Sequence, residues 1–201
     1  METTQDNLSH NDSMLIIQKM IGSARNSFTD NGTGWLIWGS MIFVASISTF
    51  FLIEFEIQPT FLAWNIFGLI SIILLTVQVF RPTKRKVVTY TEEVLSYVEK
   101  AFIICLFIVI FSMNVSVSPN DGFGFLLMLY GFLMLAQGGA LRFRPLIIGA
   151  IINWLGALAI FLNRDFQYDM LISAAAVFAG YIIPGLLLRK ATRANRLNDG
   201  I

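Results

Sequence analysis

Few residues in this chain could do chemistry, and most of them lie in polar segments. Glu54 and Glu56 are two positions apart, so on one helix they point to nearly opposite sides and do not form a cooperating carboxylate pair. Asp165 and Asp169 are four positions apart and could share a helix face, where the helix dipole favours negative charge near the N-terminus. A divalent-cation site built from these acids is an alternative.

Other catalytic arrangements lack partners. The single histidine, His10, lies in a polar tail, and the single cysteine, Cys105, lies in an apolar segment, so neither a metal cluster nor an intrachain disulfide is expected. Serines occur in apolar segments, but we expect no His, Lys or Asp at the same depth to activate them. The chain has no Gly-rich phosphate loop followed by Lys. We therefore expect no enzyme activity and no cofactor.

The segments that must position these residues are apolar. Of 201 residues, 56% are hydrophobic and 13% charged, against about 25% charged in soluble domains. The apolar residues form blocks of about 18–22, the helical length that crosses a hydrocarbon core about 30 Å thick. We predict an all-α polytopic membrane protein with six transmembrane helices, at 35–53, 61–80, 101–117, 123–141, 146–162 and 170–188.

The remaining segments form two tails. Residues 1–34 are expected to be a cytoplasmic tail whose residues 13–29 form an amphipathic helix along the inner membrane surface, and docking to a protein partner is the alternative role of this helix. The six-helix transmembrane domain covers 35–188, and 189–201 is a basic cytoplasmic tail. The first apolar block begins only at Trp35, so we expect no cleavable signal peptide.

The distribution of charge predicts the orientation. An even number of crossings places both termini on one side, together with every Lys and Arg except Arg164, and the positive-inside rule identifies that side as the cytoplasm. Nucleic-acid binding is not expected, because no recognition helix or aromatic platform accompanies the basic residues. The residues expected to set the topology and to contact anionic lipid headgroups are Arg81, Lys84, Arg85, Lys86, Arg142, Arg144, Arg189 and Lys190.

Two local patterns refine the connections. The stretch RFRP at 142–145 predicts a tight cytoplasmic turn, because each arginine at mid-bilayer would cost on the order of 2.5–3.5 kcal/mol. Pro145 suits the first turn of the fifth transmembrane helix, where its missing N–H is not needed. Thr89 followed by Glu92 resembles a capping box, so the third transmembrane helix is expected to begin in the preceding cytoplasmic loop.

Neutral polar and small residues are the remaining candidates inside the membrane. Asn65, Gln78, Gln137 and Asn153 could form hydrogen bonds between helices or line a path for a substrate or ion. The small residues Gly149, Gly156, Ala176 and Gly180 predict close helix packing. Pro184 predicts a kink in the sixth helix, either static or acting as a hinge.

Three motifs carry a resemblance. GWLIWGSMIF (34–43), ALRFRPLIIGAIINW (140–154) and GYIIPGLLLR (180–189) resemble motifs of an uncharacterised family of small six-span bacterial inner-membrane proteins. The resemblance extends over most of the chain and implies a location in the bacterial cytoplasmic membrane. It implies no catalytic residues.

These features favour a non-enzymatic membrane module that senses the state of the bilayer or holds a cytoplasmic partner protein. A small transporter or channel for an uncharged or weakly polar solute is the alternative, based on the amide and glycine residues. An intramembrane enzyme is disfavoured by the missing acid, base and metal ligands. Convergence of Glu54, Asp165 and Asp169 on one pocket would revive it.

Overall fold

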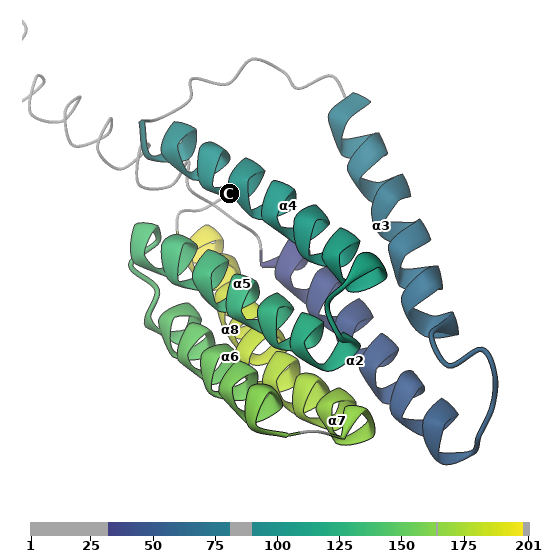
Figure 1. The fold of residues 1–201 in the computed structure, drawn as a ribbon. Helices are drawn as coiled ribbons and strands as arrows, with labels where there is room; N and C mark the ends of the chain where they lie inside the picture. The colour runs from purple at the N-terminus through teal and green to yellow at the C-terminus, as the bar shows by residue number, and fades with distance from the viewer. Residues whose placement is uncertain (1–31, 81–89, 164, 199–201) are drawn as a thin grey trace, which may run out of the picture.

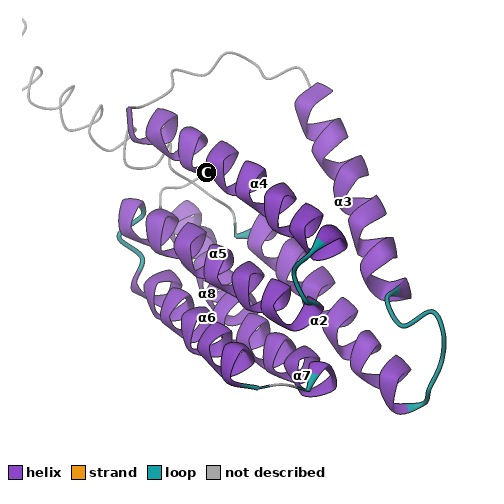
Figure 2. Ribbon diagram, in the orientation of Figure 1, coloured by secondary structure: helices purple, strands orange, loops and turns teal. Residues whose placement is uncertain are grey.

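The computed structural model describes residues 32–80, 90–163 and 165–198, without the side chains of 75–80, 91–92 and 194–198. Within these ranges the chain is helical and contains no strand (Figure 1, Figure 2). The expected amphipathic helix at 13–29, the basic residues Arg81, Lys84, Arg85 and Lys86, and Arg164 lie outside the described residues. The elements are α2 (Thr33–Glu54), α3 (Leu62–Phe80), α4 (Tyr90–Val115), α5 (Pro119–Ala140), α6 (Arg144–Leu162), α7 (Phe166–Val177), the π-helical segment η1 (Phe178–Ile182) and α8 (Ile183–Asn198).

Within the described residues, five helical segments are long and apolar enough to cross a membrane. They are Thr33–Glu54, Glu93–Val115, Pro119–Ala140, Arg144–Leu162 and Phe166–Arg193. In α3, the stretch whose side chains are described, Leu62–Leu74, is apolar but shorter than a span. The all-α class is thereby confirmed for the described residues, and the six crossings and their topology stay predictions.

The helix ends follow the local sequence. Helix α4 begins at Tyr90, well before its apolar part, so the prediction of a helix that starts in the preceding loop is confirmed. Pro145 lies in the first turn of α6, as expected, where no intrahelical N–H donor is required. Ser118 caps α5 by accepting a hydrogen bond from the Asp121 backbone N–H at 3.3 Å. The last predicted helix is built from α7, η1 and α8, which run on without a break from Phe166 to Asn198.

The most extensive helix contact joins α5 to α6, and it depends on glycine. Gly124, Gly131 and Gly138 recur every seven residues along α5, and a Cβ at each would collide with α6, at Phe161, Trp154 and Leu146 respectively. Small residues allow this approach because the neighbouring helix fills the space of the missing side chains. The Trp154 indole N–H also donates to the Met128 carbonyl across the contact at 3.1 Å.

The core lies where α2, α5, α6 and α7 meet, and α3 and α4 are peripheral (Figure 1). Among the described helices, α3 packs against α2 and α4 against α5. The side chains on their outer faces are exposed and apolar, which is the surface that a lipid environment accommodates. The largest fully buried apolar side chains are Leu127, Met134, Leu146, Ile160, Met170 and Val177.

Candidate functional site

The two ends of the bundle carry opposite charge. The basic end holds Arg142, Arg144, Arg189 and Lys190, all exposed. The turn between α5 and α6 places Arg142 at a φ of 52°, and the Phe143 and Arg142 N–H groups donate to the carbonyls of Gly138 and Gly139 at 2.9 and 3.2 Å. This pair of bonds is the Schellman arrangement that closes a helix C-terminus. The predicted tight turn at RFRP is therefore confirmed.

The acidic end holds Glu54 at the end of α2, Asp121 near the start of α5, and Asp165 and Asp169 at the start of α7. Glu54 Oε2 accepts a hydrogen bond from the Gln167 side chain at 2.6 Å, which ties α2 to α7. Asp165 caps α7 by accepting from the Gln167 backbone N–H at 3.0 Å. In the described part of the chain, no group of three or more His, Cys, Asp or Glu residues could hold a metal ion.

The burial of Asp169 was not predicted from the sequence. Its side chain is completely buried, although we placed it just before the sixth predicted span. Oδ1 accepts a hydrogen bond from Asn163 Nδ2 at 2.8 Å, and Oδ2 has no hydrogen-bond partner within the described residues. Ser173 lies one turn further along α7, also buried, and its Oγ has no hydrogen-bond partner among the described residues. A buried aspartate thus lies one helical turn from a buried serine, although no hydrogen bond joins the two side chains there.

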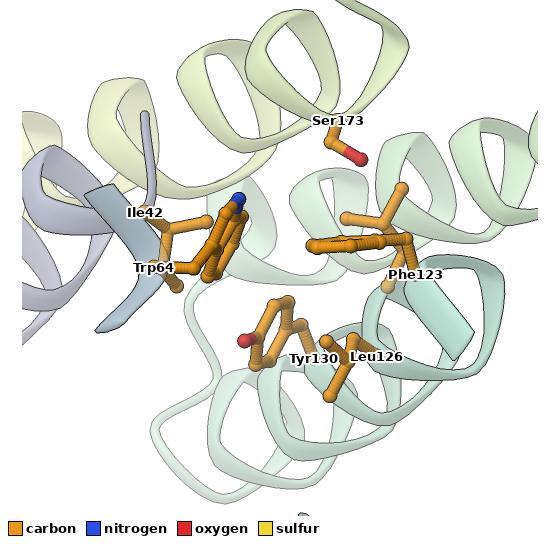
Figure 3. Close-up of a pocket in the computed structure, with 7 residues that line it drawn as sticks. Ile42, Trp64, Phe123, Leu126, Tyr130 and Ser173 are labelled. Atoms are coloured by element: carbon orange, nitrogen blue, oxygen red, sulfur yellow. The ribbon is translucent and has the colours of Figure 1, made fainter. Parts of the chain in front are cut away.

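A small pocket opens beside Ser173. It has a volume of about 10 Å³, room for about one water molecule, and is lined by Ile42, Trp64, Phe123, Leu126, Leu127, Tyr130 and Ser173, from α2, α3, α5 and α7. The Ser173 hydroxyl points into it (Figure 3). The buried Trp64 indole N–H has no partner in the described structure. Small-molecule sites usually enclose about 300–1,000 Å³, so this pocket suits water rather than an organic ligand.

The candidate polar residues do not share one site. Asn65 is exposed on α3, and the side chain of Gln78 lies outside the described residues. Gln137 is half-buried and donates to Glu99 Oε1 at 2.8 Å, an interhelical bond between α5 and α4. Asn153 is completely buried in α6, where its amide donates to the Gly149 carbonyl at 2.9 Å and faces the Met134 sulfur at 3.5 Å. Asn153 Oδ1 has no partner among the described residues.

The small residues pack as predicted. A Cβ on Gly149 would collide with the Gly180 carbonyl oxygen, and one on Gly156 would come within 2.8 Å of the Ala176 Cβ. Helix α6 therefore approaches α7 and η1 backbone to backbone. Pro184 is buried at the start of α8, and the irregularity lies just before it, as the π-helical turn of Phe178–Ile182.

Comparisons with known proteins add no identification. No protein-family model, no curated protein and no solved structure matches this chain.

Proposed function

We propose that this protein is a multi-pass membrane module that senses the bilayer or holds a cytoplasmic partner, without catalysing a reaction. The observation that carries the proposal is the filled interior of the bundle. Leu127, Met134, Leu146, Ile160 and Met170 are each at most 2% exposed where α5, α6 and α7 meet. The pocket beside Ser173, about 10 Å³, is far smaller than an organic substrate usually requires.

The proposal includes six spans, with both termini in the cytoplasm and the chain in a bacterial inner membrane. The sorting of basic residues supports the orientation, because Arg142, Arg144 and Arg189 are exposed at one end of the bundle while Glu54 and Asp165 lie at the other. The resemblance of the three motifs to small bacterial inner-membrane proteins supports the location. The basic end would contact anionic lipid headgroups.

Partner binding is tested by deletion. Full-length protein and a variant lacking residues 1–30 are crosslinked in membranes and purified, and the captured proteins are quantified. We expect a defined set of cytoplasmic proteins to be lost with the deletion, because residues 13–29 carry the amphipathic pattern that suits helix docking. A control variant keeps residues 1–30 but has Arg81, Lys84, Arg85 and Lys86 changed to Gln. It shows whether the basic charge of the loop, rather than the N-terminal helix, captures the proteins. An unchanged set of captured proteins would exclude docking through this tail.

One observation favours the alternative, a transporter or channel for a weakly polar solute. Asn153 is completely buried in α6 and its Oδ1 is unpartnered among the described residues, as expected of a residue that meets a passing solute. Flux in proteoliposomes tests this role, with Asn153→Leu and Gln137→Leu compared with the wild type. If the protein transports a solute past Asn153, the flux of at least one solute in the panel should fall at least tenfold in Asn153→Leu. Equal flux in all three proteins across a broad panel rejects it.

A further inference from the structure

The hydroxyl groups of the apolar helices fall into two classes. Thr49, Ser71 and Ser112 each donate to the backbone carbonyl one turn earlier, at 2.8, 2.7 and 2.8 Å. This local bond satisfies a hydroxyl in a membrane helix, where lipid offers no partner. Ser46 and Ser173 do not make it, since both are buried and neither Oγ has a hydrogen-bond partner among the described residues. Of these two, Ser173 points into the pocket between α2, α3, α5 and α7 (Figure 3).

The same pocket is lined by a hydrogen-bond donor from α3. The indole nitrogen of Trp64 is buried and has no hydrogen-bond partner in the described part of the chain. The ring packs edge-on against Phe123 of α5, with 4.7 Å between ring centroids, and against Phe67 of its own helix at 5.5 Å. An indole N–H can only donate, and a buried tryptophan usually finds an acceptor for it. We therefore expect the acceptor for Trp64 to lie in the pocket that its ring lines.

The size and the lining of the pocket define what can fill it. Its volume of about 10 Å³ holds about one water molecule. No charged side chain of the described residues lines it, so an ion would have no counter-charge there. The polar side chains of the lining are Ser173, Trp64 and Tyr130, and the others are hydrocarbon. A buried water needs two to four polar partners, and Ser173 and Trp64 alone supply two.

The pocket lies near the acidic end of the bundle. Trp64 is in the first turn of α3, Phe123 is in the second turn of α5, and Ser173 is about two turns into α7. These three helices begin at the same end, where Phe61 packs against Phe166 with 5.5 Å between ring centroids. Water from the adjacent solution can therefore reach the pocket without crossing the hydrocarbon core.

We propose that one water molecule occupies this pocket and bridges the Trp64 indole to the Ser173 hydroxyl. Trp64 donates to the water oxygen, and the water donates one of its hydrogens to Ser173 Oγ. In the described structure the backbone of α3 approaches that of α2 alone, so the bridge adds a hydrogen-bonded link from α3 to α7. The water thus ties a peripheral helix to the core. This inference does not depend on the proposed scaffolding role.

The first test is direct observation of the water. Full-length protein in lipid nanodiscs is imaged at a resolution that shows ordered water. A density peak is expected at hydrogen-bond distance, about 2.5–3.2 Å, from both Trp64 Nε1 and Ser173 Oγ. A pocket without such a peak, or a direct hydrogen bond between the two side chains, overturns the proposal.

The second test is amide hydrogen exchange of residues 62–74 of α3 in the same nanodiscs. Ser173→Ala removes one partner of the water and should speed this exchange by about tenfold, because α3 loses its link to α7. Trp64→Phe removes the other partner. Adding Ser173→Ala to Trp64→Phe should then speed exchange by less than about twofold, because the bridge is already broken. The matched control Ser71→Ala removes a hydroxyl that bonds its own helix, and should leave exchange unchanged.

Two exchange results would reject the bridge. Unchanged exchange in Ser173→Ala means that this hydroxyl does not hold α3. A further increase of about tenfold in the double variant means that Trp64 and Ser173 act independently of each other. If Trp64→Phe does not fold, the comparison of Ser173→Ala with Ser71→Ala decides, and equal exchange in those two variants rejects the proposal.

Discussion

At the scale of single residues, two helices end on a charged residue where glycine is usual. Glu56 and Arg142 both have a φ of 52°, after α2 and α5 respectively. At each, the next N–H donates back to the carbonyl five positions earlier, Ile57 to Leu52 and Phe143 to Gly138, both at 2.9 Å. A side chain in this left-handed conformation costs on the order of 1 kcal/mol relative to glycine.

Replacing Arg142 with glycine isolates this cost. Arg142→Gly should stabilise the folded protein by about 0.4–1 kcal/mol, because glycine adopts a positive φ without steric strain. Arg142→Ala, which removes the same charge but keeps a Cβ, should give no such gain. Thermal unfolding in detergent measures both variants. Equal midpoints for the glycine and alanine variants would show that the backbone conformation at this turn carries no strain.

The contact between α6 and η1 depends on a missing methyl group. Gly149→Ala should destabilise the protein by about 1–3 kcal/mol, because the added Cβ meets the Gly180 backbone, which cannot rotate away as a side chain would. Gly139→Ala is the matched control, since no atom lies within 4 Å of its added Cβ. Unfolding midpoints compare the two. A loss in Gly139→Ala as large as that in Gly149→Ala would contradict the packing explanation.

At the scale of elements, the last helix contains the main irregularity of the described structure. The Ile183 N–H donates to the Phe178 carbonyl, five residues back, which defines the π-helical turn. Pro184 follows directly, and a proline deprives the carbonyl four residues earlier, that of Gly180, of its usual donor. The structure thus shows a widened turn directly before Pro184, and the predicted kink, static or acting as a hinge, stays a prediction.

Pro184→Ala tests whether the proline maintains this turn. Alanine restores an N–H that can reach the Gly180 carbonyl, so we expect amide hydrogen exchange across residues 178–184 to slow by about tenfold. Exchange in α6, which lies against η1, should change little and serves as the internal control. Unchanged exchange in 178–184 would mean that the packing of Gly180 against Gly149 holds the π turn without the proline.

At the scale of the whole molecule, the proposed orientation predicts which positions are reachable from outside. In a Cys105→Ser background, Ile57→Cys in the α2–α3 connection should react with an impermeant thiol reagent in intact bacterial cells. Ala191→Cys, exposed near the basic end of α8, should react only after the membrane is permeabilised. The reverse pattern would overturn the orientation. Reaction of both positions in intact cells would rule out the odd number of crossings that the six-span topology places between them.

Much of the fold could be predicted from the sequence, because the length of an apolar block is a local property. The helices α2, α5 and α6 match the predicted spans to within a few residues. The turn at Arg142 followed from charge, and the position of Pro145 in the first turn of α6 followed from the missing proline N–H. The candidate site was less predictable. The sequence placed Asp169 just before the sixth predicted span. Its burial was not predictable because it depends on Asn163 and the start of α5, which come from other parts of the chain and pack around it.

One available signal was overlooked. The seven-residue spacing of Gly124, Gly131 and Gly138 marks the face of α5 that meets α6, and it can be read directly from the sequence. No comparable spacing shows which polar residues of the apolar helices are buried. Ser46 and Thr49 look the same in the sequence as Ser71, but Ser46 and Thr49 are completely buried in α2, whereas Ser71 is only partly buried in α3.

The sequence alone determined that the chain is helical, where the apolar helices run, and how charge is divided between their ends, because hydropathy and helix length act within each segment. The tertiary structure decided which faces of those helices meet. In lipid an apolar side chain is equally suited to a neighbouring helix or to an acyl chain, so hydrophobic pattern does not choose between them. Close packing and buried polar contacts make that choice, and they placed Gly149 on Gly180 and enclosed Asp169 beside Ser173.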